Sequence, residues 1–180
     1  DMAERTGCQA VGNMCDISSK FVVAGPTTTT TSDDFYRMFT VKWIAYMGVP
    51  ERIGSDMGSA FVANAAKFFE QLFGVTIHMF SEAPDHHEHA SYIENLNKLL
   101  RDMIDRADLR GDVRSKDDLE LLCALYMVRA NQILVRFMTT PFEITYGQPP
   151  RTPISCAEHT PSVVPPEVDP FSMHFLRTLM

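Results

Sequence analysis

Apolar runs at the beginning of the chain predict a β-hairpin. Residues 10–15 and 21–24 are short runs rich in apolar and β-branched side chains, and a polar segment at 16–20 separates them. Runs of this kind on either side of turn-forming residues are typical of antiparallel strands. We expect Gly25 and Pro26 to end the second strand. Residues 1–3 are interpreted as the remnant of an earlier strand.

Farther along the chain, apolar residues recur at helical spacing. This pattern predicts a helix at 33–47 that Gly48 and Pro50 end, with an apolar face formed by Phe35, Met38, Phe39, Ile44 and Met47. The same reasoning predicts further helices at 64–73, 91–109, 115–133 and 141–147, strands at 52–55 and 75–80, and a polar loop at 82–90. Strands followed by alternating helices and strands indicate a mixed α/β domain.

Composition places these elements in one domain. The chain has 180 residues, and we expect a folded domain at 1–150 followed by a proline-rich, extended or disordered tail at 151–180. The net charge of −7 has the wrong sign for strong binding of nucleic acid by this piece alone. The four cysteines lack CxxC spacing, which argues against a zinc ribbon and indicates reduced thiols of an intracellular protein. No apolar run has the length of a membrane span, so no membrane partner is expected.

Two acidic residues occupy positions that suit a metal site. Asp56 directly follows the predicted strand at 52–55, and Glu94 lies in the first turns of the predicted helix at 91–109. Sites in open α/β sheets lie at the carboxyl ends of the strands. Carboxylate oxygens are the ligands that Mg²⁺ prefers, and an acid on a facing helix could share the ion. The sequence therefore predicts a divalent metal site that includes both carboxylates.

Four segments resemble the integrases of retroviral-like, gypsy-type and copia-type retroelements, and they occur in the family's order. The segment Asp16-Ile17-Ser18-Ser19-Lys20-Phe21 resembles the hairpin-turn motif DxxSKF. Residues 48–61 resemble GxPxxxxSDxGxxF, residues 86–97 resemble the H…G…ExxN segment, and residues 140–147 resemble sPFELxYG. Each motif alone is weak, but together they extend over roughly residues 1–155.

The resemblance implies an RNase H-like fold: a mixed five-stranded sheet, with its first three strands antiparallel and the others parallel, flanked by helices. It also implies a triad of two aspartates and a glutamate that binds Mg²⁺ or Mn²⁺. Asp56 and Glu94 match the second and third acids. For the first acid we favour Asp1 over Asp16, which belongs to the turn motif, and the remaining alternative is that this acid is absent.

The same resemblance implies a DNA-binding surface beside the triad. His86 and Asn97 stand at family positions, and Lys98 and Arg101 follow Glu94 on one helix face. We predict that these two cations contact phosphate groups. The alternative for Lys98 and Arg101 is a solvated helix face with i,i+4 ion pairs.

Three functions are compatible with these residues. The first is the catalytic core of a retrotransposon integrase, which processes DNA 3′ ends and transfers element ends into target DNA as a homo-oligomer in the nucleus. The second is a catalytically inactive, integrase-derived module kept for nucleic-acid or protein interaction. The net charge favours this module, as do Ser91 and Asn95, which replace the family's Gly and Arg. The third, a nuclease without transfer activity, is disfavoured by the integrase-like segment at 141–147.

Overall fold

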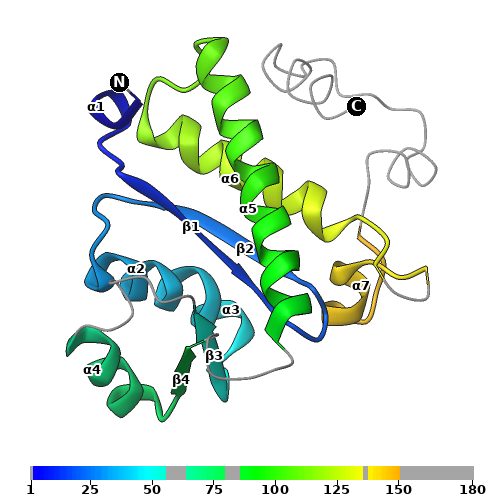
Figure 1. Cartoon of the computed structure of the whole chain (residues 1–180). Helices are drawn as coiled ribbons and strands as arrows, with labels where there is room; N and C mark the ends of the chain where they lie inside the picture. Colours follow the sequence, from blue (N-terminus) through cyan, green and yellow to red (C-terminus); the bar gives the residue numbers. More distant parts are fainter. Residues whose placement is uncertain (1, 56–63, 80–85, 136–137, 151–180) are drawn as a thin grey trace, which may run out of the picture.

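The structure is a computed structural model that describes residues 2–55, 64–79, 86–135 and 138–150 (Figure 1). Asp1, Asp56 and the predicted tail at 151–180 lie outside these ranges. The elements follow in the order α1 (Met2–Thr6), β1 (Ala10–Cys15), β2 (Val22–Thr27), α2 (Ser32–Phe39), η1 (Thr40–Ile44), α3 (Ala45–Met47), β3 (Arg52–Ser55), α4 (Asn64–Phe73), β4 (Thr76–Met79), α5 (His86–Leu109), α6 (Lys116–Asn131) and α7 (Pro141–Tyr146).

The strands β1 and β2 form the predicted antiparallel hairpin, in which Val11 pairs with Pro26 and Gly12 with Gly25. The Asp16 N–H donates to the Phe21 carbonyl at 2.9 Å, so these two residues form a hydrogen-bonded pair. Along an antiparallel ladder, hydrogen-bonded pairs alternate with non-bonded pairs. Even-numbered residues of β1 therefore bond to β2, while odd-numbered residues direct their N–H and C=O groups away from it. Pro26 lies in a non-bonded pair, so its missing N–H removes no bond to β1. For this reason β2 continues to Thr27, and our prediction that it ends at Gly25-Pro26 was wrong.

Helices cover both faces of the hairpin (Figure 1). Gly12 faces α2 so closely that a Cβ there would lie 2.2 Å from Met38 Cε. On this side the core contains the buried residues Phe39, Trp43 and Phe69. The opposite side packs against α5 and α6, and buries Val22, Ala24, Leu96, Leu100, Leu119 and Tyr126. The hairpin is thus the middle layer between two helical layers.

The other two strands form a separate parallel pair, β3 with β4, in which Ile53 lies opposite Ile77. Over the described ranges the chain therefore has two two-stranded sheets, in place of the five-stranded sheet that we predicted. The predicted mixture of antiparallel and parallel pairing is present. No hydrogen-bonded ladder between described strands joins β1 to β3.

Two local predictions were wrong for identifiable reasons, and a third element is present with an unexpected feature. Residues 2–6 form the helix α1 and no strand; Gly7 ends it with φ +66° and donates its N–H to the Ala3 carbonyl. The helix α5 begins at His86, because nothing in 86–90 breaks a helix. The helix predicted at 33–47 contains a π-helical segment, η1, where Thr40 Oγ1 donates to the Tyr36 carbonyl at 2.8 Å.

Side chains of η1 and α6 lie along the outer edge of β2. Asn131 of α6 accepts the Val22 N–H at 2.7 Å and donates to the Val22 carbonyl at 2.9 Å, as a neighbouring strand would. Lys42 of η1 lies against Gly25 and pairs with Glu120 of α6. Because η1 and α6 cover opposite faces, this ion pair joins the two helical layers around the edge of β2.

Candidate functional site

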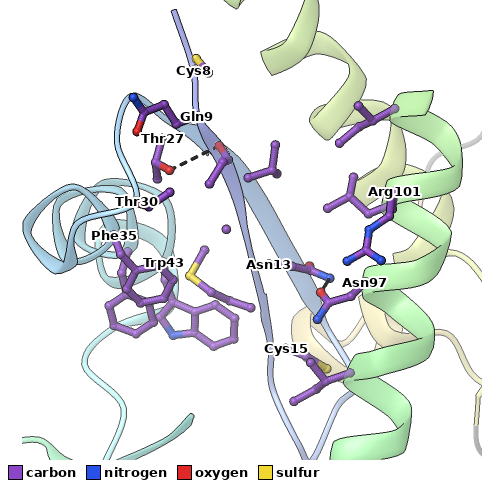
Figure 2. Close-up of a pocket in the computed structure, with 18 of the residues that line it drawn as sticks. Cys8, Gln9, Asn13, Cys15, Thr27, Thr30, Phe35, Trp43, Asn97 and Arg101 are labelled. Carbon is purple, nitrogen blue, oxygen red and sulfur yellow. Dashed lines mark hydrogen bonds between the residues drawn. The ribbon is translucent and has the colours of Figure 1, made fainter. Parts of the chain in front are cut away.

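A cavity of about 1020 Å³ lies beside β1, and both apolar side chains and several charged ones line it. Its walls come from β1, from β3, from the aromatic face of α2 and η1, and from one face of α5. Figure 2 shows Phe35 and Trp43 on one side of β1, and Asn97 and Arg101 on the other. We call this cavity the central groove.

The α5 wall of the central groove presents a row of polar side chains. Glu94, Asn97, Arg101 and Asp105 line it, at the three- and four-residue spacing that places residues on one helix face. All four side chains are exposed. Lys98 is also exposed but is not among the lining residues. Of the two predicted phosphate-binding cations, the structure therefore places Arg101 in the central groove and Lys98 beside it.

Asn97 is held by a network that begins on β1. Asn13 Nδ2 donates to Asn97 Oδ1 and to the Tyr126 hydroxyl, each at 3.0 Å (Figure 2 draws the first bond). The Tyr126 hydroxyl in turn donates to the Leu96 carbonyl at 3.3 Å. Burial raises the pKa of Tyr126, so this hydroxyl keeps its proton. With its oxygen occupied by Asn13, Asn97 offers its amide N–H groups to the central groove.

The network includes a residue that the sequence analysis missed. Asn13 lies in β1 between Val11 and Cys15, and its Oδ1 is buried without a hydrogen-bond partner among the described residues. An asparagine inside a strand is a weak signal that was available, since this residue is disfavoured in strands. Arg52 and Asp105, which also line the central groove, carried no such signal.

Of the predicted triad, Glu94 is the one member within the described residues. Asp1 and Asp56 lie outside them, and of His86 the backbone in α5 is described but not the side chain. Gly54, two positions before Asp56, lines the central groove together with Glu94. The described part of the chain contains no group of three His, Cys, Asp or Glu that could hold a metal.

Asp16 stabilises the hairpin turn between β1 and β2. Its Oδ2 accepts the Ser19 N–H and the Ser19 hydroxyl, each at 2.7 Å. This Asx-type turn is what its place in the turn motif predicts. The carboxylate is therefore already engaged by donors, although the residue also lines the central groove.

Charges of both signs meet in the central groove. The acids Asp16, Glu94 and Asp105 line it together with the cations Arg52 and Arg101. Acids thus outnumber cations at the surface where phosphate was expected to bind, in keeping with the net charge of −7. A divalent cation beside Glu94 would reverse this local balance.

Comparison with known proteins gives relatives among retroviral polyproteins, while no family model matches the chain. It is 27% identical over 135 residues to the Gag-Pol polyprotein of baboon endogenous virus (strain M7), with 75% of this chain and 8% of that protein covered. It is 27% identical over 154 residues to the Pol polyprotein of feline endogenous virus ECE1, with 86% and 14% covered. The Gag-Pol polyprotein of gibbon ape leukemia virus is 29% identical over 135 residues, with 75% and 8% covered. The chain thus spans a small part of each relative.

A solved structure has the same fold. The chain matches a simian T-cell lymphotropic virus intasome, determined in complex with PP2A regulatory subunit B56 gamma, with a TM-score of 0.61 and 16% identity over 89% of this chain and 52% of that one. The fold class is therefore RNase H-like α/β, as predicted. The chain is thus similar in sequence to part of retroviral Pol polyproteins and similar in fold to a retroviral intasome chain. Among the described helices, none is long and apolar enough to cross a membrane.

Proposed function

We propose that the chain is the catalytic core of a retroelement integrase, which processes DNA 3′ ends and joins them to target DNA. The observation that carries this proposal is the α5 face on which Glu94, Asn97 and Arg101 line one groove with Gly54 at the end of β3. The chain position that follows β3 is that of Asp56. The likeness to an intasome supports the proposal at the level of the fold.

In the proposed reaction, an oxygen of water or of a DNA 3′-hydroxyl attacks a phosphodiester. One P–O bond forms to this oxygen, which gives up its proton to solvent, the bond to the leaving 3′ oxygen breaks, and the leaving oxygen takes a proton from solvent. Mg²⁺ or Mn²⁺ would activate the attacking oxygen and stabilise the leaving one. Glu94 supplies an exposed, hard carboxylate of the kind these ions prefer. Asp56 and Asp1 would complete the ligand set.

The polar groups of α5 would hold the DNA in this proposal. Arg101 would pair with a phosphate as a charged hydrogen-bond donor, and the amide N–H groups of Asn97 would donate to a neighbouring oxygen. Lys98 and His86 would contact the DNA beside the groove. We further propose homo-oligomeric action on element ends and target DNA in the nucleus, with residues 1–150 as the folded unit and 151–180 as its tail.

A strand-transfer assay with Mg²⁺ or Mn²⁺ tests the proposal. We expect Glu94→Gln and Asp56→Asn each to reduce product at least 100-fold, because each removes a charged metal ligand. The matched control is Asp102→Asn, on α5 but not lining the central groove, which should retain activity within about twofold. Full activity of both triad variants would refute the assignment.

The inactive-module alternative has its own supporting observation, the excess of acids in the central groove. It predicts that no divalent metal yields product, while DNA or protein binding persists. Measuring strand transfer and DNA binding on the same preparation separates the two functions. The inactive-module function would be established if DNA binds, no strand-transfer product forms, and Glu94→Gln leaves the binding unchanged.

A further inference from the structure

A chain of hydrogen bonds connects two neighbouring residues of α5 through two other elements. The Leu96 carbonyl accepts the Tyr126 hydroxyl of α6 at 3.3 Å, and the Tyr126 oxygen accepts Asn13 Nδ2 of β1 at 3.0 Å. Asn13 Nδ2 also donates to Asn97 Oδ1 at 3.0 Å, as Figure 2 shows. This hydrogen-bond chain therefore begins at Leu96 and ends at the next residue of the same helix, Asn97.

The direction of every bond in the hydrogen-bond chain follows from its first member. A backbone carbonyl can only accept, so the single hydrogen of the Tyr126 hydroxyl is directed to Leu96. The Tyr126 oxygen then accepts from Asn13, whose amide nitrogen is its one donor. Because the same nitrogen lies next to Asn97, Asn97 presents its oxygen to it. Tyr126 has an exposed fraction of 0%, and burial raises the pKa of its hydroxyl, so neither water nor proton loss disturbs this order.

The oxygen of Asn13 shows that this direction is held at the expense of stability. Asn13 Oδ1 is buried and has no hydrogen-bond partner among the described residues. A buried acceptor without a partner destabilises a fold, and such groups are rare in native structures. The two neighbours of Asn13 therefore both use its nitrogen, although an arrangement that used its oxygen would satisfy the orphaned atom.

The consequence for Asn97 is that its two amide N–H groups remain for the central groove. Asn97 is exposed, lines the groove, and has its oxygen bonded to Asn13. An unrestrained asparagine can turn its amide over and present the oxygen instead, which would repel a phosphate oxygen. Arg101, one turn farther along the same helix face, has donors and no acceptor. Held in this way, Asn97 and Arg101 present donors only.

We propose that Asn13 and Tyr126 are positioning residues, which hold the Asn97 amide with its donors toward the central groove so that it binds a phosphate oxygen of DNA. The proposal rests on the DNA contact proposed above for Asn97, and it adds the two residues that determine the polarity of that contact. Both act through Asn97, so their effect on DNA affinity should disappear when the Asn97 amide is removed.

Nuclear magnetic resonance of the free, full chain tests the direction of the bonds in the absence of DNA. We expect the side-chain amide protons of Asn13 to exchange with water about tenfold or more slowly than those of Asn97, because both are hydrogen-bonded. They should also give a nuclear Overhauser effect to the Tyr126 ring. Equal exchange, or slower exchange at Asn97, would overturn the proposal. This measurement needs no variant, so it is decisive even where a substitution unfolds the chain.

A double-mutant cycle on DNA affinity tests whether the positioning residues act through Asn97. The probe is a short blunt-ended DNA duplex with Mg²⁺ at low salt, followed by fluorescence anisotropy. We expect Asn13→Leu and Tyr126→Phe each to weaken binding about threefold or more, the effect of one misdirected hydrogen bond, and by less than about 1.5-fold in an Asn97→Ala chain. The matched control is Tyr46→Phe, which removes an exposed hydroxyl outside the central groove and should leave affinity unchanged.

The outcomes separate an error in the hydrogen-bond chain from an error in the proposed function. Equal losses with and without the Asn97 amide would show an effect on the fold in general and would overturn the positioning role. If Asn97→Ala leaves DNA affinity unchanged while the amide protons exchange in the expected order, the DNA contact is overturned and the direction of the bonds stands. A loss confined to one of two duplex sequences would overturn the phosphate assignment in favour of a base contact.

Discussion

The side-chain amide of Asn131 makes two hydrogen bonds to the backbone of Val22, and we call this pair of bonds the Asn131 bridge. It allows a quantitative test of the fold. Asn131→Ala removes both hydrogen bonds to Val22, whose exposed fraction is 0%. Water therefore cannot replace the lost partners. A buried polar group left without a partner costs about 1–3 kcal/mol. Since an N–H and a C=O are both orphaned, we expect the free energy of unfolding to fall by about 3 kcal/mol or more.

Urea unfolding followed by far-ultraviolet circular dichroism measures this loss. Trp43 emission serves as a second probe, and coincident transitions justify a two-state treatment. For a chain of this size, a loss of about 3 kcal/mol lowers Tm by roughly 6–12 °C. Asn95→Ala is the matched control, since Asn95 is exposed on α5 and should change stability by less than about 0.5 kcal/mol.

Asn131→Asp separates the two bonds of the bridge. The introduced carboxylate still accepts the Val22 N–H but cannot donate to the Val22 carbonyl. Protonation restores a donor, so the pKa of this group is raised in the folded state, and its stabilising effect is present at low pH and lost as pH rises. The stability gap to wild type should therefore narrow below about pH 4. A loss under about 1 kcal/mol for Asn131→Ala would refute the reasoning.

Four further predictions concern helix ends, a thiol and the DNA surface. Thr140→Ala should cost about 1 kcal/mol in urea unfolding, because Thr140 caps α7 through its hydroxyl, and Thr140→Ser should retain that stability. Gly7→Ala should cost about 1–2 kcal/mol in the same assay, because φ is +66° there. Burial raises the pKa of Cys123 from 9.0 to about 12, so its contribution to stability is intact below pH 9 and lost toward pH 12; Cys123→Ala should flatten the decline seen by alkaline denaturation. If the proposed DNA contact forms, Arg101→Gln should reduce the slope of log affinity against log salt by about 0.9, and Lys98→Gln should reduce it by less.

Local signals in the sequence were sufficient to predict most elements. The predicted strand at 52–55 and helix at 64–73 match β3 and α4, because Gly48, Pro50 and Gly74 mark turns beside them. The helix α7 begins at Pro141 and ends before Gly147, as the preferences of these residues at helix ends indicate. In each case the residues that fix the boundary lie within a few positions of it.

Predictions that depended on distant partners were less successful. Whether Pro26 ends a strand depends on which backbone groups of β2 face β1, and the sequence does not give this register. The five-stranded sheet came from the family resemblance, whereas the described residues form two separate pairs. The role of Asn13 depends on Asn97 and Tyr126, which are far away in the chain. For the triad, the placement of Asp1 and Asp56 stays a prediction.

The Asn131 bridge also limits how the chain can assemble through its hairpin. A filament built by strand addition needs two open edges on every subunit, one that receives a strand and one that passes the pairing on. With Val22 occupied by the Asn131 amide and Pro26 beside it on the outer edge, β2 cannot act as the second edge. The hairpin therefore cannot pass strand pairing on from one molecule to the next, and filament growth through it is blocked.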